Sequence, residues 1–461
     1  MMSRTVLVQL KGVTEDMYQN IVEDLEKNIL QGTYKKKKLP SVRELAKCYH
    51  CSQSTVVKAY ESLKMKHIVY SVPQSGYYVL ENLLKNEVVD NSVIDFSTGN
   101  PLIGKIHIPD LKHCLNRAVD SSNNYSALRD LHGTESLRNI MSKYLANFQV
   151  FTSPKSIFVN LGVQQALSML TQMPFPNGKD VILIEQPTYR FFTDFLKHIG
   201  AKVKGIKRSE EGIDLNLLEA IFREEKIKFF YTVPRNHNPL GTSYSKAERK
   251  AIAALAAKYD VYIVEDDYFG DVSSIDHKYD TIYTLGDHYH HIYLKSFSKI
   301  IPWFRIGLVV IPIHLVPTFE EHAWYSYYHS YFSASLVSQA TLDIYIRSKL
   351  LEKHVSSIRK ELGQRLKALR GGFRDIEKYQ MTCIGGESGF YSYLKLPEYI
   401  NENLFINELR KQHVLVTSGR LYYIDDSFYE KGVRLSISRS NSREIQKGLQ
   451  VICGVLEKYI K

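Results

Sequence analysis

The sequence predicts two folded parts: a small, basic, mostly helical N-terminal module and a large α/β region built on a largely parallel sheet. The chain has 461 residues, enough for about three domain-sized units. Residues 1–80 contain twelve Lys/Arg and seven Asp/Glu, so nearly half of the net charge of +11 lies in about a sixth of the length. From about residue 94, strand-like apolar runs alternate with helical patterns, which is typical of a parallel α/β sheet.

Composition excludes several classes of protein. Hydrophobic residues make up 44% and charged residues 24% of the chain, which is typical of globular proteins and excludes a mostly disordered, collagen-like or coiled-coil chain. A bilayer span needs about 20 apolar residues, and the longest apolar run, over 306–317, is interrupted by Pro312 and His314. The N-terminal residues MMSRTVLVQLKG lack the apolar core of a signal peptide, and the odd number of five cysteines favours a reducing compartment. We therefore expect a cytoplasmic protein with no membrane segment.

The basic module has the element order of a DNA-binding domain. Apolar residues at helical spacing predict a first helix over 14–30. Ser41, with a glutamate three residues later, has capping-box spacing and predicts a second helix. A third helix begins at Ser52, and two short strands over 68–72 and 77–80 follow it. Three helices followed by a hairpin form a winged helix-turn-helix, whose third helix enters the major groove of DNA.

The string LPSVRELAKCYHCSQSTVVKAYESL, with the later VPQSGYYV, resembles the GntR family of bacterial repressors and activators over about 70 residues. Many relatives carry Arg at the position of Gln53, so either a phosphate or guanine contact is missing or the target base differs. The resemblance implies that double-stranded operator DNA is contacted by Arg43, Ser54, Thr55, Lys58, Gln74, Ser75 and Gly76.

Two further features of this region concern a possible metal site and the boundaries of the domains. Cys48 and Cys51 form a C-x-x-C pair, but no second Cys or His pair lies nearby, so we expect packing and no metal site. The polar stretch 81–93 is predicted to be a linker that spans far if extended. The predicted organisation is a DNA-binding domain over 1–80, this linker, and an α/β domain over 94–461.

In the large region, polar motifs follow the predicted strands at their carboxyl ends, where ligands bind in parallel sheets. Taken singly each motif is weak, because a glycine before a helix is usually an ordinary turn and two adjacent acids commonly cap a helix or bind a metal. The predicted strands are 157–161, 180–184, 228–233, 261–264, 291–294 and 307–311. The motifs, in chain order, are Gly162-Val163-Gln164, Pro187-Thr188-Tyr189, Asn238-Pro239-Leu240-Gly241, Glu265-Asp266-Asp267-Tyr268, Ser296-Phe297-Ser298-Lys299 and Arg305-Ile306-Gly307.

In this order the motifs resemble the fold-type I aminotransferases that use pyridoxal 5′-phosphate (PLP), over nearly all of 95–461. The resemblance implies that Lys299 forms a Schiff base with the cofactor aldehyde and that Asp266 keeps the pyridine nitrogen protonated. The other implied contacts are Asn238 and Tyr268 to the phenolate oxygen, Tyr189 to the ring face, Ser296, Ser298, Arg305, Val163 and Gln164 to the phosphate, and Arg434 to an effector carboxylate. The stretch Ile300–Phe304 is one residue shorter than in many relatives, so the phosphate loop is expected to differ.

A GntR-like reader joined to an aminotransferase-like domain resembles the MocR (GabR-like) subfamily of GntR-type regulators. The resemblance implies a head-to-tail, domain-swapped homodimer that binds PLP and responds to an amine or amino acid. Three hypotheses stay open at this point. The chain is a PLP-dependent transcriptional regulator, an active aminotransferase with a regulatory N-terminal module, or a sensor of PLP itself.

Overall fold

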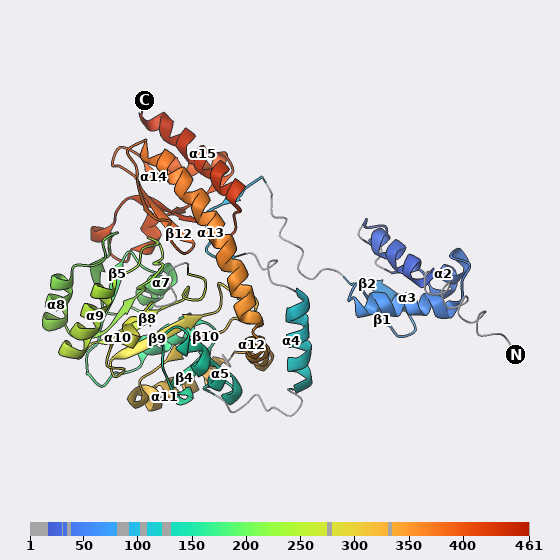
Figure 1. Cartoon of the computed structure of the whole chain (residues 1–461), viewed down its shortest axis with the longest axis horizontal. Helices are drawn as coiled ribbons and strands as arrows, with labels where there is room; N and C mark the ends of the chain where they lie inside the picture. The colour runs from blue at the N-terminus through green and yellow to red at the C-terminus, as the bar shows by residue number, and fades with distance from the viewer. Residues whose placement is uncertain are drawn as a thin grey trace. The chain divides into compact units, whose positions relative to one another are not determined.

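The computed structural model describes residues 17–29, 31–34, 38–80, 92–101, 108–121, 131–273, 279–330 and 334–460 (Figure 1). The chain divides into two compact units, Met1–Asp90 and Asn91–Lys461. They are called the N-terminal unit and the C-terminal unit below, and each is described by itself. The predicted linker over 81–93 falls mostly outside the described residues, which resume at Ser92.

The described residues of the N-terminal unit form three helices and a hairpin. Residues 17–29 are helical, and the later elements are α2 (Val42–Cys48), α3 (Gln53–Met65), β1 (Val69–Val72) and β2 (Gly76–Val79). Ser41 begins α2 with the predicted capping box, and the Ser52 side chain caps α3 by accepting the Thr55 N–H. The winged helix-turn-helix expected from the sequence is confirmed, with strand bounds that differ by one residue.

A small apolar core holds this unit together. Ile21 and Leu25 of the first helix pack with Leu45 of α2 and Val56 of α3. Tyr60 of α3 is fully buried, and its ring stacks on Tyr77 of β2 with 4.2 Å between centroids. This contact fixes the hairpin against the third helix, so α3 and the wing form one body.

A seven-stranded sheet forms the centre of the C-terminal unit. Its strand order is β4-β10-β9-β8-β7-β5-β6. The strands are β4 (Ile157–Asn160), β5 (Val181–Gln186), β6 (Val203–Lys207), β7 (Ile227–Thr232), β8 (Tyr262–Asp266), β9 (His291–Ser296) and β10 (Gly307–Val310). Strands β5 to β9 pair in parallel, which confirms the largely parallel α/β sheet.

Two strands differ from the sequence prediction. Strand β10 pairs antiparallel with both β9 and β4, because the short connection from Ser296 to Gly307 leaves no room for a helical crossover. Strand β6 was not predicted, since it is a short edge strand that contains two lysines, Gly205 and only two apolar residues. The five other predicted strands agree within a few residues.

Helices cover both faces of this sheet. Leu183, Phe230 and Ile263 point to one face, where they pack with α8 and α9, which Figure 1 shows side by side. Their sequence neighbours Ile184, Tyr231 and Val264 belong to the core on the other face. The helices of this part are α4 (Ile108–Ser121), α5 (Glu135–Ala146), α6 (Val163–Gln172), α7 (Arg190–His198), α8 (Leu215–Glu224), α9 (Lys246–Tyr259), α10 (Ile282–Leu285), α11 (Val316–Ser330) and α12 (Leu336–Arg347).

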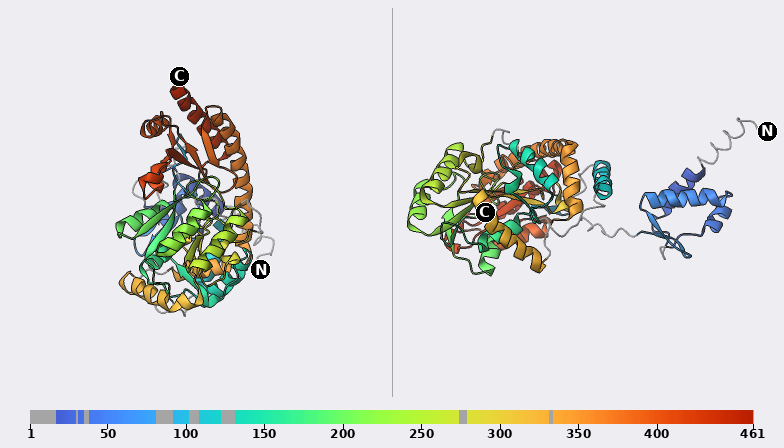
Figure 2. Two further views of the ribbon diagram at one scale, coloured as in Figure 1. Left: turned by 90° about the vertical axis from the view of Figure 1, so that its left-hand side faces the viewer. Right: turned by 90° about the horizontal axis from the view of Figure 1, so that it is seen from below.

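The C-terminal part of this unit is a second, smaller layer. Its antiparallel sheet has the order β11-β12-β15-β14, and Figure 2 shows it from two further sides. The long helix α13 (Leu350–Glu377) runs from this layer alongside the large sheet, and α15 packs against it. The remaining elements are β3 (Ile94–Asp95), β11 (Thr382–Gly385), β12 (Tyr391–Lys395), α14 (Glu402–Lys411), β13 (Val414–Leu415), β14 (Thr417–Ser418), β15 (Gly432–Ser436) and α15 (Ser442–Ile460). Among the described helices, none combines the length and the apolar character that a membrane span requires.

Candidate functional site

A pocket lies at the carboxyl ends of the parallel strands. Most of the cofactor residues expected from the sequence line it together, from five different chain segments. The lining residues are Val163, Tyr189, Val233, Asn238, Asp266, Tyr268, Ser296, Ser298, Lys299 and Tyr391. Of the expected set, Gln164, Arg305 and Arg434 do not line the pocket itself.

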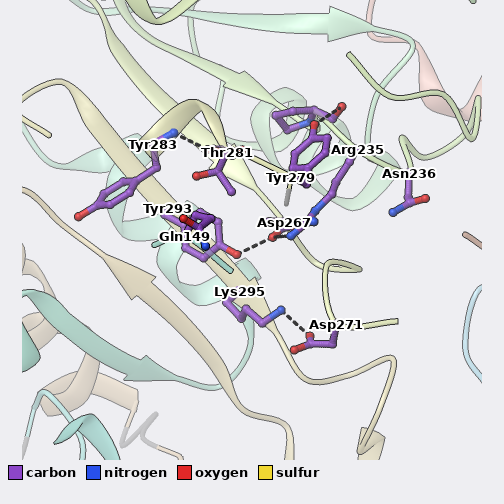
Figure 3. Close-up of polar contacts among 12 residues, drawn as sticks. Gln149, Arg235, Asn236, Asp267, Asp271, Tyr279, Thr281, Tyr283, Tyr293 and Lys295 are labelled. Carbon is purple, nitrogen blue, oxygen red and sulfur yellow. Dashed lines mark hydrogen bonds and ion pairs between the residues drawn. The ribbon is translucent and has the colours of Figure 1, made fainter. Parts of the chain in front are cut away.

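Lys299 supplies the only amine among these lining residues. It follows β9, and its Nζ donates a hydrogen bond to the carbonyl of Gly99, at 2.7 Å. Lys295, four residues earlier, is fully buried in an ion pair with Asp271, as Figure 3 shows. Since Lys295 is held by this partner, Lys299 is the lysine that remains to react with a ligand in the pocket.

Asp266 ends β8 and is completely enclosed by protein. Its Oδ2 accepts a hydrogen bond from the hydroxyl of Tyr231, at 2.8 Å, while its Oδ1 has no partner among the residues described. Burial, together with the nearby charge of Asp267, raises the pKa of this carboxyl to about 7, against the lowering effect of Tyr231 and Lys299. A buried acceptor of this kind fits a ligand that brings a hydrogen-bond donor or a positive charge.

The next residue, Asp267, has the opposite environment. Arg235 donates from Nε to its Oδ1 at 2.6 Å and also pairs with its Oδ2, and the Tyr293 hydroxyl donates to it at 2.5 Å (Figure 3). Although burial acts to raise it, the Arg235 guanidinium holds the pKa of Asp267 below its usual range. The two adjacent acids therefore differ: Asp267 is saturated by protein partners, whereas Asp266 lines the pocket and has one oxygen without a partner among the described residues.

The helix start at one end of the pocket is suited to an anion. Gly162, with φ of 90°, precedes α6, whose first N–H groups have no intrahelical partner. Gly307 of β10 lets the two chain segments approach, because a Cβ there would lie 2.5 Å from the Gly162 carbonyl carbon. The hydroxyls of Ser296 and Ser298 lie 2.8 Å apart beside this end. Arg305 is exposed at the surface, in left-handed conformation with φ of 51°.

Tyr189 and Tyr268 are held from two sides of the pocket. The amide of Gln164 donates to the Tyr189 hydroxyl at 2.8 Å, so Gln164 positions a pocket residue without lining the pocket. The Tyr268 hydroxyl donates to the carbonyl of Asn236 at 2.5 Å. Asn238 is buried, and its Oδ1 has no hydrogen-bond partner within the described ranges. Asn238 is thus a second polar group that a ligand could complete.

The loop that carries Asn238 is held by hydrogen bonds to a buried carboxylate. Glu185, at the end of β5, accepts hydrogen bonds from the Val233 N–H at 2.9 Å and the Tyr244 hydroxyl at 2.5 Å. Although burial acts to raise it, the neighbouring His237 and Arg208 lower the pKa of Glu185 to about 2. This network fixes the backbone from Val233 onward, and so the position of Asn238.

Arg434 lies on β15 and is 5% exposed. Its guanidinium donates to the carbonyl of Ser97 and to Thr417 Oγ1, and its Nε has no partner in the described part of the chain. The Tyr391 ring centroid is 5.0 Å from its Cζ. Because Tyr391 also lines the pocket, this ring connects Arg434 to the Lys299 side of the site.

Sequence reasoning missed Tyr391, Tyr231 and Val233. Tyr391 follows the glycine-rich segment 385–389 and starts β12, and its hydroxyl occupies the place that a Cβ on Gly99 would take. Those two residues are almost 300 positions apart, so no local pattern connects them. Tyr231 lies inside a buried strand, and nothing in the strand pattern distinguishes it from a core residue.

The residues expected to contact DNA lie on the outer parts of the N-terminal unit. Arg43 is exposed on α2, and Ser54 and Lys58 are exposed on α3, with Thr55 half-buried beside them. The wing residues Gln74 and Ser75 lie in the turn between β1 and β2, and Gly76 begins β2; the positive φ values of 60° at Gln74 and 114° at Gly76 shape this turn. Among the described residues, no cluster of His, Cys, Asp or Glu could hold a metal ion.

Fold and pocket together define a class of protein: a helix-turn-helix domain joined to a fold-type I, PLP-transferase-like domain. Residues 91–452 match the family "Aminotransferase class I and II", which is PLP-dependent, and residues 17–79 match "Bacterial regulatory proteins, gntR family". The chain belongs to the aminotransferase class I and II family and carries a GntR helix-turn-helix domain, the MocR-like architecture.

Whole-length relatives share this arrangement. The chain is 37% identical over 445 residues to an uncharacterized HTH-type transcriptional regulator, YcxD, of Bacillus subtilis, covering 95% of this chain and 99% of that protein. It is 25% identical to the HTH-type transcriptional regulator NorG of Staphylococcus aureus, over 91% of this chain and 100% of that protein. A kynurenine aminotransferase structure from Pyrococcus horikoshii superposes with a TM-score of 0.73 at 23% identity, covering 81% of this chain and 92% of that one. This last likeness shows the fold.

Proposed function

We propose that the protein is a PLP-dependent transcriptional regulator of the cytoplasm. The N-terminal unit binds operator DNA, and the C-terminal unit holds PLP on Lys299 and senses an amine, an amino acid or PLP itself. The observation that carries the proposal is that Lys299 and Asp266 line the same pocket, where Asp266 Oδ1 has no hydrogen-bond partner among the described residues. The same chain carries a basic module with an exposed third helix.

The polar groups left incomplete in the pocket fit PLP one by one. Asp266 Oδ1 suits the protonated pyridine nitrogen, and the α6 start with Ser296 and Ser298 suits the phosphate. Asn238 suits the ring oxygen, and Tyr189 suits the ring face. When bound, PLP supplies an electron sink for reactions at an amine-bearing carbon. The protein contributes position: Gly99 orients the Lys299 amine, and Tyr231 orients the carboxylate.

Covalent retention of PLP tests the cofactor part of the proposal. The full chain would be incubated with PLP and dialysed, and its visible absorption compared with that of Lys299→Ala. We expect the wild type to retain a visible band and the variant to lose it. Equal bands in the two proteins would contradict the assignment of Lys299.

The effector part of the proposal rests on Arg434. A buried guanidinium beside the pocket suits a carboxylate, so an amino acid is the effector class that uses all of these groups. We propose that the effector acts by binding two states of the regulator with different affinity, which changes DNA binding. We also propose a head-to-tail, domain-swapped homodimer, which analytical ultracentrifugation of the full chain would test.

A second candidate function is transamination. The pocket holds both Lys299 and Asp266, the two groups that PLP chemistry on an amine requires. The test is turnover with an amino donor and a keto-acid acceptor. Sustained keto-acid production, absent in Lys299→Ala, would favour the enzyme, and a spectral change without turnover would favour the regulator.

A further inference from the structure

Two exposed side chains lie one turn apart near the beginning of α3. Gln53 and Val57 are both exposed, and 40% of the Val57 side chain is accessible. Residues four apart lie on the same face of a helix. Core packing does not explain an apolar side chain exposed on this face of α3 beside a primary amide.

The other polar side chains at this helix start already have partners inside the module. The Ser52 hydroxyl, which caps α3, lies 2.7 Å from the Ser54 hydroxyl and 2.8 Å from that of Thr55. The Lys58 ammonium lies 4.5 Å from the ring centroid of Tyr18, on the first helix. Short hydroxyls gathered at a helix N-terminus and a tethered lysine are suited to phosphate oxygens, which carry no sequence information.

Reading of base edges therefore falls on Gln53 and Val57. In the major groove, a glutamine amide matches the N6 and N7 atoms of adenine, and an apolar side chain matches the C5 methyl group of thymine. Both partners belong to A·T base pairs. We propose that Gln53 reads an adenine edge and Val57 a thymine methyl group, so that together they select neighbouring A·T pairs in the operator. This inference rests on the proposed function, in which α3 enters the major groove.

Replacing thymine by uracil tests the Val57 contact, because it removes only the methyl group. Full chain loaded with PLP would first select its preferred duplex from a random-sequence pool. Each thymine of that duplex would then be replaced singly by uracil. We expect one thymine in each half-site at which uracil weakens wild-type binding about four-fold, the equivalent of one buried methyl group. Val57→Ala should bind the thymine and uracil duplexes equally.

The matched control is Val72→Ala. Val72 is a valine of similar exposure, 38%, on strand β1 of the same unit, and its variant should keep the wild-type ratio between thymine and uracil duplexes. Gln53 is tested in the same way with 7-deazaadenine, which lacks N7. Gln53→Ala should lose the discrimination that the wild type shows at one adenine. Far-UV circular dichroism of all variants confirms that the exposed substitutions leave the fold intact.

The outcomes separate this inference from the proposed function. If no duplex is enriched from the pool, the proposed DNA-binding function fails, and the inference falls with it. If a duplex is enriched but no thymine is sensitive to uracil, the inference alone is overturned. The same holds if Val57→Ala keeps the full wild-type ratio at the sensitive thymine.

Discussion

The pocket of the C-terminal unit and the outer face of α3 differ in how far their side chains are buried and paired. Around the pocket, charged groups are enclosed and paired: Arg235 with Asp267, and Lys295 with Asp271, all less than 5% exposed. On α3, Gln53 and Val57 point to solvent, and the local contacts are among short hydroxyls. The charged groups behind the pocket are thus paired within the protein, whereas Gln53 and Val57 on the α3 face are exposed to solvent.

This difference sets how strongly each region responds to a single substitution. Removing one member of a buried ion pair leaves an uncompensated charge and costs about 3–5 kcal/mol. Exposed side chains usually change stability by less than about 0.5 kcal/mol. Substitutions behind the pocket should therefore alter folding, and substitutions on α3 should alter DNA binding alone.

The largest effect on the free energy of unfolding is expected from a comparison of substitutions at Lys295 and Lys299. Lys295→Met should reduce the free energy of unfolding by about 3–5 kcal/mol, because Asp271 is left charged and buried. Lys299→Met should change it by less than about 1 kcal/mol in PLP-free protein, since within the described ranges its Nζ donates one hydrogen bond, to the Gly99 carbonyl. Urea unfolding of the two variants measures this difference. Equal losses of stability would contradict the division between a structural and a reactive lysine.

A smaller effect is expected from the pH dependence of Asp266. Its pKa is raised by burial to about 7 in the folded protein, from 3.8 in the unfolded chain. The folded state therefore holds this proton more tightly. The resulting stabilisation is present below pH about 4 and is lost as the pH rises to about 7, by up to about 4 kcal/mol.

Asp266→Asn removes this titration and keeps the size of the side chain. In PLP-free protein, the free energy of unfolding of the wild type should fall relative to that of the variant between pH about 4 and about 7. Glu265, whose pKa burial also raises to about 7, is present in both proteins and cancels in the comparison. Parallel curves for the two proteins would show that Asp266 stays charged without a ligand.

The effector response should depend on Arg434 for one class of ligand only. A charge-assisted hydrogen bond contributes about 1.5–3 kcal/mol, so Arg434→Ala should weaken the binding of amino acids roughly ten-fold or more. Amines without a carboxylate should bind the variant and the wild type alike. Spectral titration of PLP-loaded protein measures both affinities. Equal weakening of the two ligand classes would indicate a distorted pocket and contradict the role of Arg434 as a carboxylate anchor.

The smallest effect is expected for a substitution in the N-terminal unit, on DNA binding. Lys58→Ala should reduce the slope of the logarithm of DNA affinity against the logarithm of salt concentration by about 1, which corresponds to one phosphate contact. Retention of PLP should be unchanged, because the substitution lies in the other unit. Fluorescence anisotropy with the selected duplex over a range of salt concentrations measures the slope. A slope equal to that of the wild type would remove Lys58 from the phosphate contacts.

The sequence predicts the pocket well because its residues belong to short motifs at strand ends. Parallel strands bring their carboxyl ends to one edge, so Asn238, Asp266 and Lys299 meet as soon as the strand order is right. The contacts behind the pocket are different. Lys295 with Asp271 and Tyr231 with Asp266 depend on the packing of distant segments, which no local pattern encodes.

The helices and strands differ in the same way: local sequence signals determine some of them, and contacts between distant segments determine others. Helix caps at Ser41 and Ser52 are local signals, and both helices begin where those signals stand. The reversed direction of β10 and the edge strand β6 follow from how the sheet is completed: the apolar run of β10 does not reveal the direction of the strand, and β6 has few apolar residues. On the exposed α3 face the sequence identifies the polar residues, but only the structure shows that Ser54 and Lys58 already have partners.

We propose that the ligand site of the C-terminal unit controls DNA binding by the N-terminal unit. The most direct test is the affinity of the full chain for its selected duplex, measured without PLP, with PLP, and with PLP plus a panel of α- and ω-amino acids. We expect PLP or one of these amino acids to change the affinity of the wild type several-fold and to leave that of Lys299→Ala unchanged. A wild-type affinity that stays constant under all three conditions would contradict this proposal.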